Sequence, residues 1–251
     1  MALPPAERTA AVRILVALDG AEAALEALST ASFLASRLQA ELHGLYVEDI
    51  DLLRLAGLPF ARTVGHASAR PQPFDFASLE RAFRQQAERM RTLMEEMADR
   101  ERLAWSFQVA RGRLMDAMMG QSGSADLLVF CRPLALRRES TGPVLVLLHR
   151  EADVTAVLPL AQALAEEGNL LVAAVDGALL ETARAWLRQR GVVARFVLWP
   201  KSDGAALAAR ERAKVVMLVS GDGLSGVDGV ALDEVGCPVV VLRRSMPPAG
   251  P

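Results

Sequence analysis

The sequence predicts an α/β protein made of two pseudo-repeated, doubly wound parallel-sheet domains, and three observations lead to this prediction. Several short segments are apolar on every side, as strands buried on both faces of a parallel sheet require. Amphipathic segments of helical period separate these strands. The alternating order of the first half recurs in compressed form in the second, which indicates an internal repeat. We therefore expect one domain over residues 1–140 and another over 141–251.

The first predicted strand organises the first half of the chain. The apolar run over residues 13–18 ends at Asp19 and Gly20, and a helical pattern follows at once. Gly20 permits a tight turn from strand to helix. Asp19 is expected at the carboxyl end of the strand, where open parallel sheets place their ligands. An acid there can equally serve only to cap the next helix, because helix N-termini favour acids.

The remaining elements of the first half follow from the same patterns. The long connection over 48–75 contains a short apolar helix near residues 52–60 and a Pro- and Gly-containing loop, and connections of this length are typical of lids, binding loops or disordered insertions. Alternating polarity predicts a half-exposed edge strand over 104–109. The other expected elements are helices over 21–39, 76–100 and 114–119, and strands over 42–47 and 127–131.

The second half is expected to repeat this order. Asp153 is a candidate N-cap of its first helix, and Gly191 is expected to end its second helix in the left-handed conformation. A Gly-rich loop over 221–229 and a helical turn over 230–235 precede the last strand. The expected strands are 144–149, 169–175, 193–199, 215–220 and 238–242, and the expected helices are 154–167, 179–190 and 205–213.

Composition narrows the class of protein. The chain has 251 residues, 52% hydrophobic and 23% charged, which suits a globular core. Mean hydropathy is +0.23, yet charged residues interrupt every apolar run before it reaches the length of a membrane span. The net charge of −2 leaves no basic face for a phosphate backbone, so nucleic acid is not an expected partner. Residues 1–10 carry prolines and charges ahead of any apolar segment, unlike a signal peptide.

The cysteines and histidines suggest no catalytic or metal centre. Cys131 and Cys237 stand apart in apolar contexts, which indicates two buried thiols in a reduced, cytoplasmic setting. The histidines lack the spacing of metal ligands, and no Ser/His/Asp, Cys/His or paired-carboxylate arrangement follows from the sequence. We expect no enzymatic activity.

Several motifs together resemble the universal stress protein family. They are RILVALDG before an Ala-rich helix, a short strand ending in LYVED, then VARGRL, ADLLVF and, near the end, GCPVVVL. The resemblance covers nearly the whole chain as two tandem domains and is faint in the second. It implies an adenine nucleotide α-hydrolase-like sheet with strand order 3-2-1-4-5, used as a tandem pair or as a homodimer joined through the last strand. Some members of the family bind ATP or AMP.

The resemblance also implies where a nucleotide would bind in the first half. Asp19 and Val47 match the residues that hold adenine and ribose, with Gly20 following the first. The phosphates of such members lie on a glycine-rich loop after the fourth strand, where backbone N–H groups supply a positive field. Here Arg132 begins a stretch with no glycine before Gly142. Arg132 and the arginines after it can replace that loop by gripping an anion, or can form a solvated linker.

The second half departs from the family pattern differently. His149 and Arg150 stand where Asp and Gly are expected, whereas the glycine spacing survives at Gly223 and Gly226. Gly221, Gly223 and Gly226 also spell a dinucleotide fingerprint, but they follow the penultimate strand instead of the first, so dehydrogenase chemistry is not expected. These glycines form either a flexible turn or a residual anion site.

The sequence thus predicts a non-enzymatic, cytoplasmic universal stress-type protein that binds a small ligand or a protein partner and has incomplete ATP-binding motifs. The alternative is an ATP- or AMP-binding regulator that uses Asp19, Val47 and Arg132. An adenylyl-transferring or redox enzyme on the same sheet is a third class. No cofactor is expected with certainty, although ATP, ADP or AMP can be accommodated, and self-association as a homodimer is expected.

Overall fold

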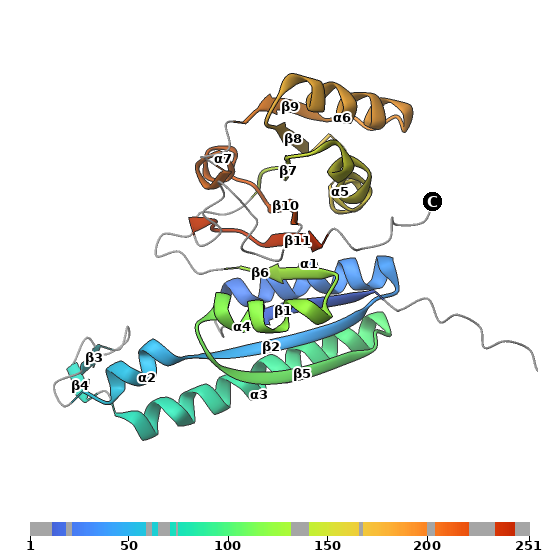
Figure 1. Cartoon of the computed structure of the whole chain (residues 1–251). Coiled ribbons are helices and arrows are strands. Elements are labelled where there is room, and N and C mark those ends of the chain that lie inside the picture. Colours follow the sequence, from blue (N-terminus) through green and yellow to red (C-terminus); the bar gives the residue numbers. More distant parts are fainter. Residues whose placement is uncertain are drawn as a thin grey trace, which may run out of the picture.

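The computed structural model describes residues 12–18, 22–58, 62–64, 71–73, 75–131, 141–165, 168–199, 204–220 and 234–243. Within them, one nine-stranded sheet runs in the order β5-β2-β1-β6-β11-β10-β7-β8-β9. The first half of the chain forms one side of this sheet and the second half the other, with β6 and β11 adjacent in the middle (Figure 1).

The first half supplies four strands of the large sheet, in the order 3-2-1-4 that the family resemblance implies. They are β1 (Arg13–Leu18), β2 (Glu41–Asp49), β5 (Trp105–Gly112) and β6 (Leu127–Phe130). All pairs among them are parallel. As predicted, β5 is an edge strand with alternating exposure. The helices are α1 (Glu22–Leu38), α2 (Ile50–Ala56), α3 (Phe76–Glu101) and α4 (Leu114–Gln121), followed by the short 3-10 helix η1 (Ser122–Ser124).

The second half supplies five strands in the full order 3-2-1-4-5. They are β7 (Val144–Leu148), β8 (Leu170–Ala174), β9 (Arg195–Leu198), β10 (Val215–Ser220) and β11 (Val239–Arg243). The helices are α5 (Glu151–Leu164), α6 (Gly177–Gln189) and α7 (Gly204–Glu211). Gly191 has φ of 68° just after α6, in the left-handed region as predicted.

The two predicted sheets are continuous. β11 is parallel to β10 but antiparallel to β6, with Val240 opposite Val129 and Val241 opposite Leu128. The fifth strand of the second half therefore also completes the sheet of the first half, in which the described residues hold no fifth strand between β6 and β7. Because the strands of the two halves run in opposite directions, their carboxyl ends face opposite edges of the sheet. Whether each half is a domain that folds by itself stays a prediction.

Two apolar layers cover the faces of this sheet. One layer packs α1, α3, α5 and α6 against residues such as Val16, Val146 and Val240. The other packs α4 and α7 against the opposite side chains, among them Leu128, Leu145 and Val241. The central strands are buried on both faces, which explains why they are apolar at every position.

Three local predictions need correction. α5 begins at Glu151, and Asp153 lies inside its first turn, where its carboxylate accepts a hydrogen bond from the backbone N–H of Arg150 at 3.1 Å. The short helix predicted near 52–60 spans Ile50–Ala56, because the Asp49 side chain caps it two residues earlier. The predicted loop over 62–73 includes a short antiparallel pair, β3 (Arg62–Val64) and β4 (Pro71–Pro73), which projects with α2 from the rest of the first half (Figure 1).

Candidate functional site at the strand ends

Most of the predicted nucleotide site falls on residues whose structure is not described. Asp19, Gly20, Arg132, Gly221, Gly223 and Gly226 lie outside the described residues, as do Arg137, Arg138 and residues 230–233 of the helical turn predicted over 230–235. The predicted nucleotide contact that the structure describes is Val47, near the carboxyl end of β2.

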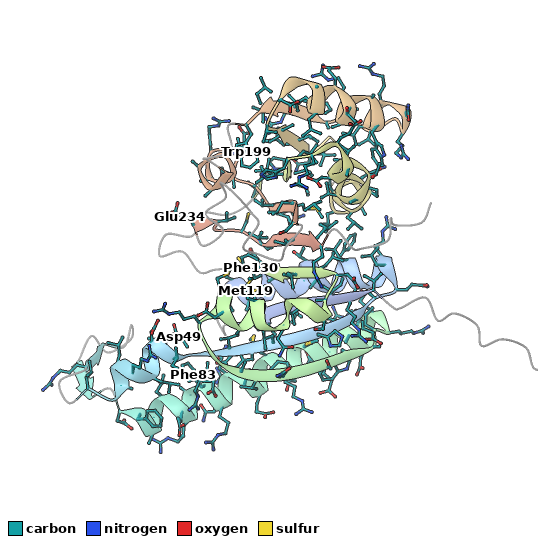
Figure 2. All side chains as sticks on the ribbon, viewed as in Figure 1. Asp49, Phe83, Met119, Phe130, Trp199 and Glu234 are labelled. Atoms are coloured by element: carbon teal, nitrogen blue, oxygen red, sulfur yellow. The ribbon has the colours of Figure 1, made fainter. Side chains whose placement is uncertain are left out.

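Val47 lies where the sequence predicts it, beside the end of the first strand. β1 ends at Leu18, which pairs with Tyr46, and Val47 follows. Its side chain is only 4% exposed and belongs to the apolar layer under α4, with Met118 and Phe130. Figure 2 shows Phe130 at the end of β6, the strand on the other side of β1. The described surroundings of Val47 are therefore apolar.

An ionic cluster lies where β2 and β5 end. Arg111 donates to Glu48 through Nε at 2.9 Å and reaches Glu80 at 3.3 Å. Hydrogen bonding to Glu48 is the main cause that raises the pKa of Arg111, with the charge of Glu48 adding to it. Arg113 donates to Asp51 at 2.9 Å, and Arg54 lies 3.4 Å from the same carboxylate.

The three arginines of this cluster border an open hollow of about 530 Å³. Its arginines face carboxylates from the same cluster, so the cluster is not a positively charged anion site. The contacts instead hold α2 against the loop that joins β5 to α4.

The second half has aromatic rings at the corresponding strand ends. Trp199 follows β9, is 2% exposed, and donates its backbone N–H to the carbonyl of Ala174 at the end of β8. The Trp199 ring meets the ring of His149, the residue after β7, edge to face with centroids 4.9 Å apart and planes at 84°. Since β8 lies between β7 and β9, the indole lies across the carboxyl end of β8. Figure 2 shows Trp199 at this edge of the second half.

Buried polar side chains also lie at the end of β10 and at the start of α5. Asp153 and Ser220 are each 1% exposed, at the start of α5 and at the end of β10. Within the described residues, Nε1 of Trp199 is buried and has no hydrogen-bond acceptor. The strand end that lacks the predicted Asp-Gly pair is thus filled by the chain's own side chains, which leaves less room for a ligand there.

Cys131 and Cys237 are both buried thiols, as predicted. Burial raises the pKa of Cys237 to about 12, and the neighbouring Cys131 adds to this effect. A thiol with this pKa remains protonated at neutral pH and is a poor nucleophile.

One solved structure shares this architecture over almost its whole length. It is described as a universal stress protein from Archaeoglobus fulgidus DSM 4304, and it aligns with 93% of this chain and 98% of its own, at 12% sequence identity and a TM-score of 0.52. This chain has the universal stress protein fold. A putative universal stress protein from Pseudomonas aeruginosa UCBPP-PA14 aligns with 93% of the chain at 16% identity, with a TM-score of 0.44 over 94% of its own length. Neither a protein family model nor a curated protein matches this chain.

The family resemblance predicts nucleotide contacts at the carboxyl end of the first strand of each half. The sequence identified His149 as a departure from the family pattern but gave no sign that Trp199 contacts it. The available signal was a large aromatic residue at the end of a predicted strand. Its partner could be found only once β7, β8 and β9 were known to be neighbours.

Two further findings concern the chain as described. Within the described residues, no group of three or more His, Cys, Asp or Glu side chains is arranged to hold a metal ion. No helix among them is both long enough and apolar enough to cross a membrane.

Proposed function

We propose that this chain is a non-enzymatic, cytoplasmic universal stress-type protein that binds a small ligand or a protein partner and has lost ATP binding in its second half. The observation that carries the proposal is the contact between the His149 and Trp199 rings at the end of β7. In nucleotide-binding members of the family, as the resemblance implies, an Asp at this strand end helps to hold the adenine and ribose. Here an aromatic pair fills the same place.

The first half has only part of the nucleotide site that the family pattern implies. Val47 is buried beside the end of β1, in a position compatible with contact to an adenine or ribose. The sequence after β6, however, has no glycine between Arg132 and Gly142 to form a backbone phosphate cradle. Binding of a small ligand without a triphosphate fits both features.

A protein partner would need a surface other than the last strand. Both edges of β11 are already paired, with β10 and with β6. A homodimer joined through β11 would require one of these ladders to open. If the predicted homodimer forms, we expect the outer edge strands or the helical faces to make the contact.

The experiment is a thermal-unfolding series with ATP, ADP and AMP, each with and without Mg²⁺. A ligand at 100 times its dissociation constant stabilises the native state by about 2.7 kcal/mol, which is readily detected. We expect no shift with any of the three. A shift that Asp19→Ala leaves intact and His149→Ala abolishes would contradict the proposal, because it would indicate nucleotide binding in the second half. Nucleotide turnover would indicate an enzyme instead.

The alternative is an ATP- or AMP-binding regulator that uses the first half, and the position of Val47 favours it. Asp19, Val47 and Arg132 would then hold the adenosine and the phosphates. This alternative predicts a shift with ATP or AMP that Asp19→Ala removes and His149→Ala leaves unchanged. The same series of measurements therefore distinguishes the two functions.

A further inference from the structure

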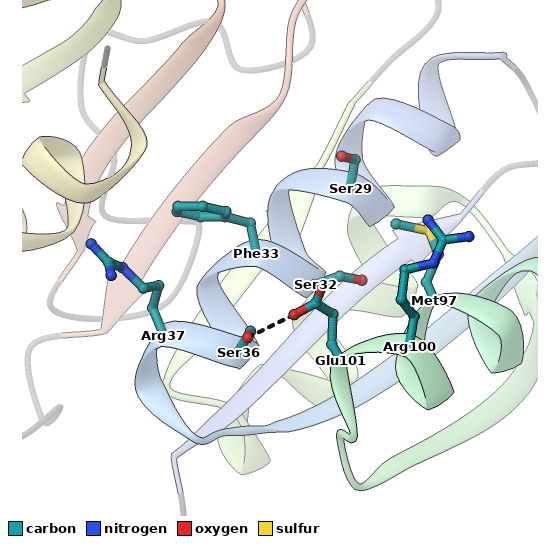
Figure 3. Close-up of a pocket in the computed structure, with 8 residues that line it drawn as sticks. All are labelled: Ser29, Ser32, Phe33, Ser36, Arg37, Met97, Arg100 and Glu101. Carbon is teal, nitrogen blue, oxygen red and sulfur yellow. Dashed lines mark hydrogen bonds between the residues drawn. The ribbon is translucent and has the colours of Figure 1, made fainter. Parts of the chain in front are cut away.

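A groove lies between the C-terminal halves of α1 and α3, far along the sheet from the strand ends described above. Both helices end near the amino ends of the strands, whereas the predicted nucleotide site lies at the carboxyl ends. The groove has a volume of about 400 Å³, which is within the usual range of small-molecule sites. Figure 3 shows Ser32 of α1 pointing toward Met97, Arg100 and Glu101 of α3, while Phe33 and Arg37 extend from α1 in the other direction in this view.

The hydroxyl of Ser32 is the first sign that the groove takes a ligand. Ser32 is 2% exposed, and its Oγ has no hydrogen-bond partner among the described residues. The side chain points from α1 toward α3 (Figure 3). One helical turn later, Ser36 does have a partner, since its Oγ donates to Glu101 at 2.9 Å. A buried hydroxyl left unsatisfied costs about 1–3 kcal/mol, and a polar group bound in the groove would remove this cost.

The charges of the groove favour a singly charged anion. Arg37 and Arg100 both line it, and Glu101 is the acid among the lining residues, which leaves one net positive charge. Arg100 is exposed and makes none of the ion pairs found among the described residues. The Glu101 carboxylate is partly engaged by Ser36. Arg100 is therefore the guanidinium best able to donate hydrogen bonds to a carboxylate.

The groove also offers apolar surface next to these polar groups. The Phe33 side chain is 42% exposed, which is unusual for a large aromatic residue on a helix that faces the core. The Arg37 guanidinium lies 6.0 Å from the centre of the Phe33 ring and partly covers it. Met97 of α3 supplies an adaptable thioether wall.

We propose that this groove binds a small organic monoanion with an apolar or aromatic body. Its carboxylate would bind Arg100 and accept a hydrogen bond from Ser32, and its body would lie against Phe33 and Met97. The site is separate from the strand ends invoked for the proposed function, so either can fail without the other.

The test is calorimetric titration of the full chain with phenylacetate, which has both the charge and the aromatic body. Acetate, which lacks the body, and 2-phenylethanol, which lacks the charge, are the matched ligands, and we expect both to bind at least about tenfold more weakly. Arg100→Gln should weaken phenylacetate binding by about tenfold or more, since it removes a charge-assisted hydrogen bond. Arg91→Gln removes an exposed arginine of the same helix that does not line the groove, and it should change nothing.

Ser32→Ala separates a ligand-binding hydroxyl from a structural one. Because the hydroxyl has no partner in the described structure, its removal should leave the free protein at least as stable as before while weakening phenylacetate binding. Three results would overturn the proposal: no measurable binding of phenylacetate, equal binding of 2-phenylethanol, or equal losses in Arg100→Gln and Arg91→Gln. An ATP titration of the same samples reports separately on the strand-end site.

Discussion

The two halves of the sheet differ in their last strand and at the end of their first strand, where a repeated fold predicts similar structure. The second half has five strands in the order 3-2-1-4-5, whereas the first half has four and takes β11 as the neighbour of its last strand. At the end of the first strand, the second half is filled by His149 and Trp199. In the first half, the described residue beside the end of the first strand is Val47, whose small side chain is buried in the apolar layer. The second half thus completes the sheet of the first, and aromatic rings fill the end of its own first strand.

The largest expected effect tests whether β11 serves both halves. Val241→Asp places a carboxylate in the apolar layer opposite Leu128, where the valine is fully buried. An unpaired buried charge should cost at least about 5 kcal/mol in free energy of unfolding. Because β11 lies between β6 and β10, we expect both halves to lose protection together in hydrogen exchange.

The matched control for this variant is Val193→Asp, at a position that is 74% exposed, and it should change stability by less than about 0.5 kcal/mol. If Val241→Asp released the second half alone while the first half kept its protection, the halves would be independent domains. That result would support the predicted boundary at residues 140 and 141.

The next effect tests the difference between the strand end that holds Trp199 and the one that holds Val47. Trp199→Ala should cost about 3–5 kcal/mol because it leaves a large cavity at the end of β8. Val47→Ala, at the strand end of the first half, should cost only about 2 kcal/mol. Urea unfolding measures both changes.

Chemical rescue makes the Trp199 comparison sharper. Apolar cavities left by large-to-small substitutions can bind small aromatic molecules. Indole should therefore restore part of the lost stability to Trp199→Ala and leave the unmodified protein and Val47→Ala unchanged. Equal losses of stability in the two alanine variants, with no rescue by indole, would mean that the Trp199 side chain does not fill the end of β8.

Two glycines offer a comparison of intermediate size. A Cβ on Gly142 would collide with the backbone carbonyls of Glu211 and Arg212, which cannot move without shifting the chain before β10. A Cβ on Gly44 in β2 would meet the sulfur of Met94, the flexible end of a long side chain. Gly142→Ala should thus cost about 2–3 kcal/mol and Gly44→Ala less than about 1 kcal/mol. The reverse order in thermal unfolding would show that the Met94 side chain is the more rigid neighbour.

Much of the fold could be predicted because local sequence specifies it. The apolar runs at β1, β6 and β7 have to be buried on both faces, so they indicate parallel strands without further information. The alternation in β5 identifies an edge for the same reason. The start of α5 was misplaced because an acid such as Asp153 serves equally well as an N-cap or inside the first turn, where its carboxylate reaches back to the Arg150 backbone.

The joining of the two sheets and the contact between His149 and Trp199 could not be predicted, because both depend on elements far apart in the sequence. Nothing in the residues of β6 specifies that β11 is its antiparallel neighbour, since both strands are apolar throughout. Trp199 and His149 are separated by two helices and two strands, so only the order β7-β8-β9 brings their rings together. The predicted glycines and Asp19 belong to connections whose structure is not described, so their roles stay predictions.

The smallest effect compares the ionic clusters of the two halves. In the first half one arginine, Arg111, lies between two acids, and in the second half one acid, Glu211, lies between Arg195 at 2.9 Å and Arg210 at 3.3 Å. The hydrogen bond from Arg195 is the main cause that lowers the pKa of Glu211. A lowered folded-state pKa stabilises the protein above the ordinary glutamate pKa, and this contribution disappears as the pH falls through the lowered value. Glu211→Gln should therefore cost less than about 1 kcal/mol at pH 7 and flatten the acid limb of the stability profile, whereas the exposed Glu151→Gln should leave that limb unchanged. An unaltered acid limb in Glu211→Gln would mean that the ion pairs of Glu211 with Arg195 and Arg210 do not stabilise the folded protein.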